Sequence, residues 1–227
     1  NLTWIVKGKT YQINNEIKLE EILSHLMFEL YPLTPEVRND GYNRREINNV
    51  QLKAGYKLIE HILHNPFEKD LGIEGNGPEY LIYATVFKNN GLNLNSLESI
   101  SSKELMELRS ALILELNRGS EGSLDKLVNI MDRKPFGIRK PLIPVLLVAL
   151  LRDKWDQLLF YRNGMFISQL NGEHIYTMVS EPDQYQYVFM HFKDEMNSFV
   201  RYLQDLFRNY IDPENRGLNK PLLVISA

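Results

Sequence analysis

Residues 158–170 have the sequence Leu158-Leu-Phe-Tyr-Arg-Asn-Gly-Met-Phe-Ile-Ser-Gln-Leu170, in which Asn163-Gly164 separates two arms rich in β-prone residues. An Asn-Gly pair between such arms is a strong signal for a β-hairpin, because both residues tolerate the positive φ that a type I′ turn requires. With this pair as the turn, Tyr161 faces Phe166 and Phe160 faces Ile167 across the hairpin.

Three helices are predicted before this hairpin. Ser102 and Ser123 are placed to cap the first and the second helix, because a serine hydroxyl accepts a hydrogen bond from a free backbone N–H of the first turn. The third helix covers the apolar run from Pro141 to Leu151. Three helices followed by a hairpin is the element order of a winged helix-turn-helix, which we expect over about residues 101–170.

The rest of the chain also predicts helices with little strand. The first half predicts a hairpin that turns near Gly8, followed by helices at about residues 19–30, 50–63 and 78–90. The first of these helices is predicted to be amphipathic and to end before Pro32, because Leu19, Ile22, Leu23, Leu26, Met27 and Leu30 follow one another at three- and four-residue steps. The second half ends with a predicted helix at 173–179, a strand at 185–192 and a docking helix from Asp194 to Tyr210.

We therefore predict a mainly α protein with small β-hairpins, in the α+β class. Residues 92–99 form a plausible hinge between two domains. Residues 1–95 are predicted to be a helical domain with an N-terminal β-hairpin. Residues 96–227 are predicted to be a winged-helix-like domain with a C-terminal strand and the docking helix.

Composition excludes several classes of protein. The 227 residues include no cysteine, which excludes a disulfide framework, a thiolate zinc site and a cysteine nucleophile. The net charge of −3 gives no general attraction to nucleic acid or to acidic lipid. No uncharged apolar stretch reaches the length of about 18 residues that a membrane helix needs, so we expect a cytoplasmic protein without a membrane partner.

The predicted third helix argues against base-specific DNA recognition. It is apolar on every side, and such a helix is normally buried. Residues 132–162 nevertheless carry seven basic and three acidic side chains, a local charge of +4. Contact with the phosphate backbone of double-stranded DNA therefore remains an alternative. The candidate residues are Arg133, Lys134, Arg139, Lys140, Lys154 and Arg162.

Other motifs do not predict chemistry. The loop from Gly72 to Gly77 lacks the spacing and the lysine of a phosphate-binding P-loop, and it predicts a tight helix entry. His61 and His64 are three residues apart on a helix, but no carboxylate completes a metal-binding motif with them. We therefore predict no catalytic residues, no metal site and no cofactor, and an unrecognised hydrolase is the least favoured alternative.

Both ends of the sequence suggest a piece of a longer protein. The chain begins with Asn1 rather than methionine, and the stretch from Pro221 to Ala227 is apolar almost to its last residue. Native termini are usually polar. On this expectation, residues outside the sequence would belong to the same polypeptide.

Three stretches resemble a known protein family: Tyr31-Pro-Leu-Thr-Pro-Glu-Val-Arg-Asn39 with Asn43-Arg-Arg45, Leu71-Gly-Ile-Glu-Gly-Asn-Gly-Pro-Glu79, and Lys134-Pro-Phe-Gly-Ile-Arg-Lys-Pro141. Together they resemble the middle, non-ATPase region of very large bacterial P-loop ATPases of phage-defence and restriction-like gene clusters, akin to the BREX-type ATPases. The resemblance implies a helical, winged-helix-bearing region that follows a nucleotide-binding domain. The chain itself has no nucleotide-binding motif, so ATP hydrolysis by these residues is not implied.

The sequence thus predicts a non-enzymatic accessory module that contacts other domains of a parent protein, or a protein partner, through its winged-helix unit. A DNA-binding module that contacts phosphates through the basic residues named above is the alternative.

Overall fold

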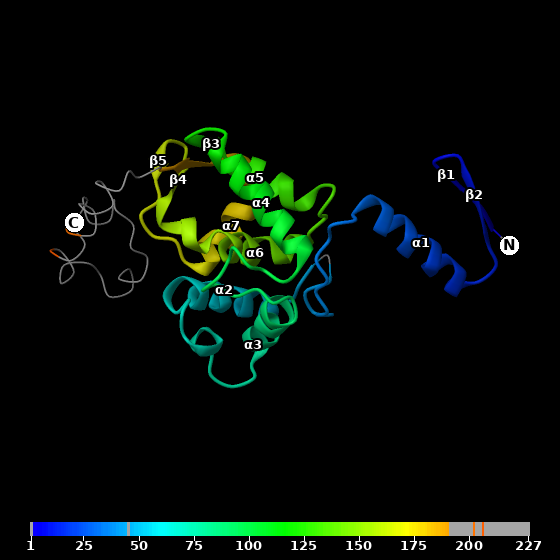
Figure 1. The fold of residues 1–227 in the computed structure, drawn as a ribbon, viewed down its shortest axis with the longest axis horizontal. Helices are drawn as coiled ribbons and strands as arrows, with labels where there is room; N and C mark the ends of the chain where they lie inside the picture. Colours follow the sequence, from blue (N-terminus) through cyan, green and yellow to red (C-terminus); the bar gives the residue numbers. More distant parts are fainter. Residues whose placement is uncertain (1, 45, 191–201, 203–205, 207–227) are drawn as a thin grey trace.

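A computed structural model describes residues 2–44 and 46–190, together with Tyr202 and Leu206. The described chain has two parts, a body and an arm that projects from one side of it (Figure 1). The arm consists of strand β1 (Leu2–Val6), strand β2 (Lys9–Ile13) and helix α1 (Glu16–Leu30). In this architecture most elements are helical and the strands are short, which confirms the predicted α+β class.

The body contains six α-helices among the described residues, which are α2 (Asn49–His64), α3 (Pro78–Tyr83), α4 (Lys103–Asn117), α5 (Leu124–Asp132), α6 (Ile143–Leu150) and α7 (Gly172–Ser180). Its strands are β3 (Glu121–Ser123), β4 (Leu158–Arg162), β5 (Met165–Phe166) and β6 (Tyr185–Phe189). Shorter helical turns are η1 (Lys69–Gly72), η2 (Ala84–Lys88), η3 (Lys140–Leu142), η4 (Arg152–Gln157) and η5 (Pro182–Gln184). The η2 turn, a π-helical continuation of α3, completes the helix predicted after Pro78.

Polar side chains fix the starts of the helices as the sequence indicates. Ser102 accepts a hydrogen bond from the backbone N–H of Leu105, and Ser123 accepts one from Asp125. Asn48 and Gln51 form a reciprocal capping box at the start of α2. Each cap satisfies backbone donors that have no partner within their helix.

The strands of the body form a four-stranded antiparallel sheet in the order β3-β6-β4-β5. The predicted hairpin is confirmed, with Tyr161 opposite Phe166 and positive φ angles of 51° at Asn163 and 77° at Gly164. Its second strand is short, and the longer partner of β4 is β6, which pairs along the whole of β4. The strand predicted at 185–192 is thus confirmed for residues 185–189, while the docking helix predicted at 194–210 lies outside the described residues except for Tyr202 and Leu206, which are helical.

Helix α6 forms the centre of the body, where it packs against α2, α5 and α7. Every residue from Ile143 to Leu150 is buried, as predicted from the apolar sequence of this helix. One cluster of buried side chains extends from Val37 to Phe189. It includes Leu92, Leu94 and Leu97 from the predicted hinge, so side chains from both predicted domains share this core.

Helix α1 of the arm has few buried side chains. Only Ile22 is buried on α1, and Leu23 and Met27 on its apolar side are 41% and 53% exposed. The main packing of α1 is against β2, and the helix projects away from the body (Figure 1). Among the described residues, no helix has the length and apolar character needed to cross a membrane.

Candidate functional site

Helix α6 offers no side chain to a DNA groove, because all eight of its residues are buried. A helix that reads base edges must present polar side chains on an exposed face. Base-specific recognition by α6 is therefore incompatible with this structure, and any contact with nucleic acid would have to use the residues around the helix.

Four of the predicted basic residues lie together on the segment from the end of α5 to the first residue of η3, which we call the basic loop (residues 133–140). Phe136 and Ile138 are buried, and the backbone N–H of Ile138 donates to Met131 O at 2.8 Å. These inward contacts leave Arg133, Lys134, Arg139 and Lys140 exposed. Within the described part of the chain, none of the four side chains forms an ion pair, so their charges are available to a ligand.

The two remaining candidates are engaged by the protein itself. Lys154 Nζ lies 3.4 Å from Asp153 Oδ2 in η4. Arg162 Nη2 lies 3.3 Å from Glu181 Oε2, and its guanidinium is centred 5.3 Å from the ring centroid of Tyr185. The structure therefore concentrates the uncommitted positive charge of the predicted set on the basic loop.

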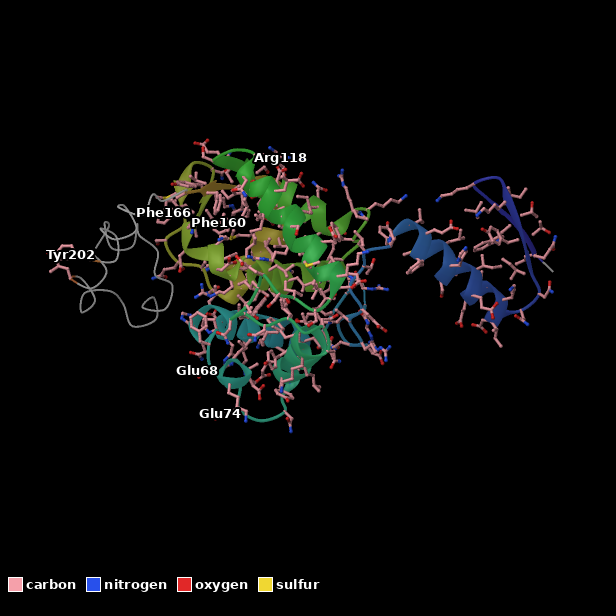
Figure 2. All side chains as sticks on the ribbon, in the orientation of Figure 1. Glu68, Glu74, Arg118, Phe160, Phe166 and Tyr202 are labelled. Atoms are coloured by element: carbon pink, nitrogen blue, oxygen red, sulfur yellow. The ribbon has the colours of Figure 1, made fainter. Side chains whose placement is uncertain are left out.

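A groove of about 670 Å³ lies beside the basic loop, between α4 and α5. Its apolar floor is formed by Ala111, Leu114 and Ile130, and its basic rim by Arg118, Lys126, Arg133 and Lys134. Leu114 is 59% exposed although its neighbours along α4, Leu112 and Leu116, are fully buried. We call this feature the α4/α5 groove. Figure 2 shows Arg118 on the opposite edge of the body from Glu68 and Glu74.

Glu115 supplies a buried negative charge to the α4/α5 groove. This residue is only 8% exposed, and its carboxylate lies 2.8 Å from Arg118 Nη1 and 3.8 Å from Lys126 Nζ. Burial and the charge of Glu115 raise the pKa of Tyr187, whose ring also lines the groove. With Glu121 as the second acidic lining residue, four cations face two carboxylates, so the groove keeps a net positive charge.

The sequence predicts two residues of the rim, Arg133 and Lys134, but not the groove itself. Ala111, Leu114, Glu115 and Arg118 recur at three- and four-residue steps, which places them on one face of α4. That spacing does not tell which other element faces them. Only the placement of α5 alongside α4 brings Lys126 and Ile130 to the same groove.

The arm is the second notable surface. Large apolar side chains are exposed on both its hairpin and its helix, although the arm is much shorter than the body. These side chains are Leu2, Trp4, Ile5, Ile17, Leu23, Met27 and Phe28. Several large apolar side chains exposed on one short element favour a site of interaction with another molecule, whereas single exposed apolar residues are ordinary.

The arm is tied to the basic loop at its base. The backbone N–H of Leu33 donates to Pro135 O at 3.1 Å, and the Thr34 hydroxyl donates to Phe136 O. The ring of Tyr31 packs so closely on Gly137 that a Cβ atom there would lie 2.4 Å from Tyr31 Cδ1. The arm thus leaves the body at a fixed point next to the basic loop and to one end of the α4/α5 groove.

The glycine-rich loop and the histidine pair make local contacts. Gly72 and Gly75 have φ angles of 67° and 76°, and Pro78 begins α3 directly after the loop, as expected of a tight helix entry. His61 Nδ1 lies 2.9 Å from Leu71 O, and His64 Nε2 lies 3.2 Å from Glu60 Oε2. Over the residues that the structure describes, no group of three or more acidic or histidine side chains is arranged to hold a metal ion.

Comparisons of the chain with protein-family models, with curated proteins and with solved structures found no match.

Proposed function

We propose that this chain is a non-catalytic interaction module of a larger, cytoplasmic bacterial ATP-dependent protein of the defence or restriction-like type. The observation that carries the proposal is the apolar surface of the projecting arm. Burial of each large apolar side chain stabilises a contact by about 1.5 to 3 kcal/mol. Burial of the exposed apolar side chains of the arm against another protein surface would therefore favour binding.

Within this proposal the body acts as a rigid support. The order α4, α5, α6 and then the β4–β5 hairpin supports a winged-helix-like unit over residues 101–170, in which α6 is a core helix. The contacts of Tyr31, Leu33 and Thr34 fix the start of the arm on this unit. A rigid support lowers the entropy that the arm must lose when it binds.

Site-specific photo-cross-linking tests the proposal. A benzophenone side chain would replace Phe28 on the arm or, as a matched control, Phe67 on the body, since these two phenylalanines are 71% and 75% exposed. In the protein expressed from its full reading frame, we expect the Phe28 position to capture a protein partner or another domain much more efficiently than the Phe67 position. Equal, low capture at both positions would contradict an interaction role for the arm.

Contact with DNA phosphates is a second candidate, favoured by the four uncommitted cations of the basic loop. Arg139→Glu/Lys140→Glu should abolish a salt-dependent shift of duplex DNA in a gel, whereas Lys53→Glu/Lys57→Glu on α2 changes the charge equally and should leave the shift intact. Each lost phosphate contact should reduce the slope of log K against log salt concentration by about 0.9. No shift of DNA by the unmodified chain at about 50 mM salt, where phosphate contacts are strong, removes this candidate.

A further inference from the structure

The exposed half of α1 combines apolar and acidic side chains. Ile17, Leu23, Met27 and Phe28 are all at least 41% exposed. At about 100° of rotation per residue, Glu16, Glu20 and Glu21 lie on the same half of the helix as these four side chains. Lys18 and His25 lie towards the other side, where Lys18 reaches Glu21 at 3.0 Å and His25 reaches Glu29 at 3.1 Å.

The charge of this half of α1 is largely uncompensated. Glu16 and Glu20 form no ion pair with any residue that the structure describes. Over Glu16–Leu30 the helix has four glutamates and one lysine, so its net charge is −3 with neutral histidine. A surface that accepts α1 must therefore be both apolar and basic.

The α4/α5 groove has these two properties. Its lining includes the exposed Leu114 and the partly buried Ile130. On its rim, Arg133 and Lys134 form no ion pair with a described residue, whereas Arg118 and Lys126 pair with Glu115 and offset its charge. Double-stranded DNA would satisfy the rim but would leave the apolar floor without a partner. An acidic amphipathic helix satisfies both, as in the recognition of a helix by a groove between two other helices.

We propose that α1 of one copy docks in the α4/α5 groove of a second copy, so that two chains exchange arms. This inference rests on the proposed function, because it names the partner of the arm. Apolar residues Leu23, Met27 and Phe28 would cover Leu114 and Ile130, while Glu16 and Glu20 would meet the basic rim.

The position of the arm makes such an exchange reciprocal. Lys134 belongs to the α4/α5 groove, and the next two residues, Pro135 and Phe136, bind the start of the arm through Leu33 and Thr34. Each arm therefore leaves the body beside its own groove and points away from the body (Figure 1). Two copies related by a two-fold axis near this point would each place an arm in the groove of the other, which gives a closed dimer and not an open chain.

The exchange would bring two long helices into the interface. Helix α1 has 15 residues and is therefore about 22 Å long. The exchange would bury two such helices, each with part of its hairpin. A specific interface of standard size buries about 800 Å² on each partner.

Charge reversal and its compensation test the arm exchange. The chain should be a concentration-dependent dimer in sedimentation equilibrium. Arg133→Glu/Lys134→Glu on the groove rim, where neither side chain forms an ion pair with a described residue, should raise the dimer Kd at least about tenfold, a change of about 1.4 kcal/mol. Glu16→Lys/Glu20→Lys on the arm should do the same. The chain that combines all four substitutions should recover most of the dimer affinity, and Lys53→Glu/Lys57→Glu should leave it unchanged.

Cross-linking identifies the surface that α1 contacts. With a mixture of isotope-labelled and unlabelled copies, the benzophenone at position 28 should form cross-links between copies to the region of Leu114 and Ile130. A chain that stays monomeric up to about 100 µM, or a dimer that all the charge reversals leave intact, would overturn the arm exchange.

The two proposals fail in different ways. Capture of a different protein by position 28 in a monomeric chain would contradict the arm exchange while supporting the interaction role of the arm. Capture at position 28 no stronger than at position 67 would contradict both.

Discussion

The guanidinium of Arg109 donates a bidentate pair of hydrogen bonds to the carboxylate of Asp153, with Nη1–Oδ1 and Nη2–Oδ2 distances of 2.9 and 3.0 Å. Arg109 is buried on α4, and Asp153 lies in η4, directly after the last turn of α6. Arg109 Nη1 also donates to Leu150 O, a carbonyl at the end of α6 that lacks a partner further along the helix. This one side chain therefore links the first and third helices of the unit over residues 101–170.

Replacement of Arg109 by methionine should destabilise the fold. The substitution leaves the Asp153 carboxylate and the Leu150 carbonyl without their partner, and the loss of one member of a buried pair costs about 3 to 5 kcal/mol. Because the Asp153 side chain is 34% exposed, we expect the lower end, about 3 kcal/mol. Urea unfolding with an unchanged m-value would measure this loss in the free energy of unfolding. Arg38→Met is the control, because the Arg38–Glu36 pair is exposed and its loss should not be measurable. Equal midpoints for the two variants would contradict a structural role for Arg109.

The Arg109–Asp153 pair should make the free energy of unfolding depend on pH in the acid range. Burial alone would raise the pKa of Asp153, but the hydrogen bond and the charge of Arg109, with a further contribution from Lys154, outweigh burial and hold this pKa below its usual value. The contribution of Asp153 is then complete above the pKa of an unfolded aspartate, about 3.9, and is lost as the pH falls through the lower pKa of the folded state. The stability difference between the unmodified chain and Asp153→Asn should therefore shrink from pH 5 to pH 2. A difference that stays constant over this range would contradict the lowered pKa.

Local sequence signals were sufficient to predict much of the fold. The burial of α6 follows from its apolar composition, because no register of the helix could hide so many large side chains on a single face. The hairpin register follows from Asn163-Gly164, since the turn type fixes which residues face each other. Ser102 and Ser123 mark helix starts, because their hydroxyl groups bind backbone donors only two or three residues away.

Contacts between residues far apart in the sequence determine the structural features that the sequence did not predict. The pairing of β4 with β6 joins strands separated by helix α7, and nothing within either strand specifies that partner. The apolar periodicity of α1 predicts an amphipathic helix, but it does not tell whether the body or a different molecule covers Leu23 and Met27. The α4/α5 groove needs residues from both helices, so Arg133 and Lys134 could be named from their local charge while Arg118 and Lys126 could not.

The buried Tyr42 and the partly buried Tyr176 should make the free energy of unfolding depend on alkaline pH. Tyr42 donates to Gln51 O at 2.7 Å, its Oη lies 3.1 Å from Tyr176 Oη, and Tyr176 donates to Pro141 O at 3.0 Å. Burial raises the pKa of Tyr42 to about 12 and that of Tyr176 well above its usual value. The unfolded chain ionises near pH 10, so this stability is present below about pH 10 and is lost as the pH rises towards 12.

Tyr42→Phe should reduce the alkaline dependence. It removes one of the two groups that ionise in the unfolded chain but not in the folded one. Unfolding curves at pH 8, 10 and 11 should therefore fall less steeply with pH for Tyr42→Phe than for the unmodified chain, although the variant is less stable at pH 8. The ultraviolet absorbance of tyrosinate should show the same two residues ionising only as the protein unfolds. Ionisation of all described tyrosines together near pH 10 in the folded protein would contradict this account.

Gly137 and Gly164 provide a matched pair that isolates the attachment of the arm. Both have positive φ, 60° and 77°, so a change to alanine costs each a similar backbone strain of roughly 1 to 2 kcal/mol. A Cβ atom at Gly164 would meet nothing within 4 Å, whereas one at Gly137 would lie 2.4 Å from Tyr31 Cδ1. Gly137→Ala should therefore destabilise the protein by about 1 to 3 kcal/mol more than Gly164→Ala, the usual range for an overpacked site.

The additional destabilisation in Gly137→Ala should be localised at the base of the arm. If Tyr31 is displaced from the basic loop, the hydrogen bond from the Leu33 amide to Pro135 O weakens. Hydrogen exchange at Leu33 should then be faster in Gly137→Ala and unchanged in Gly164→Ala, because only the first substitution disturbs this contact. Tyr31→Ala combined with Gly137→Ala removes the collision and should be less destabilising than the sum of the two single changes. Strict additivity, with equal exchange at Leu33 in both glycine variants, would show that Tyr31 does not hold the arm to the basic loop.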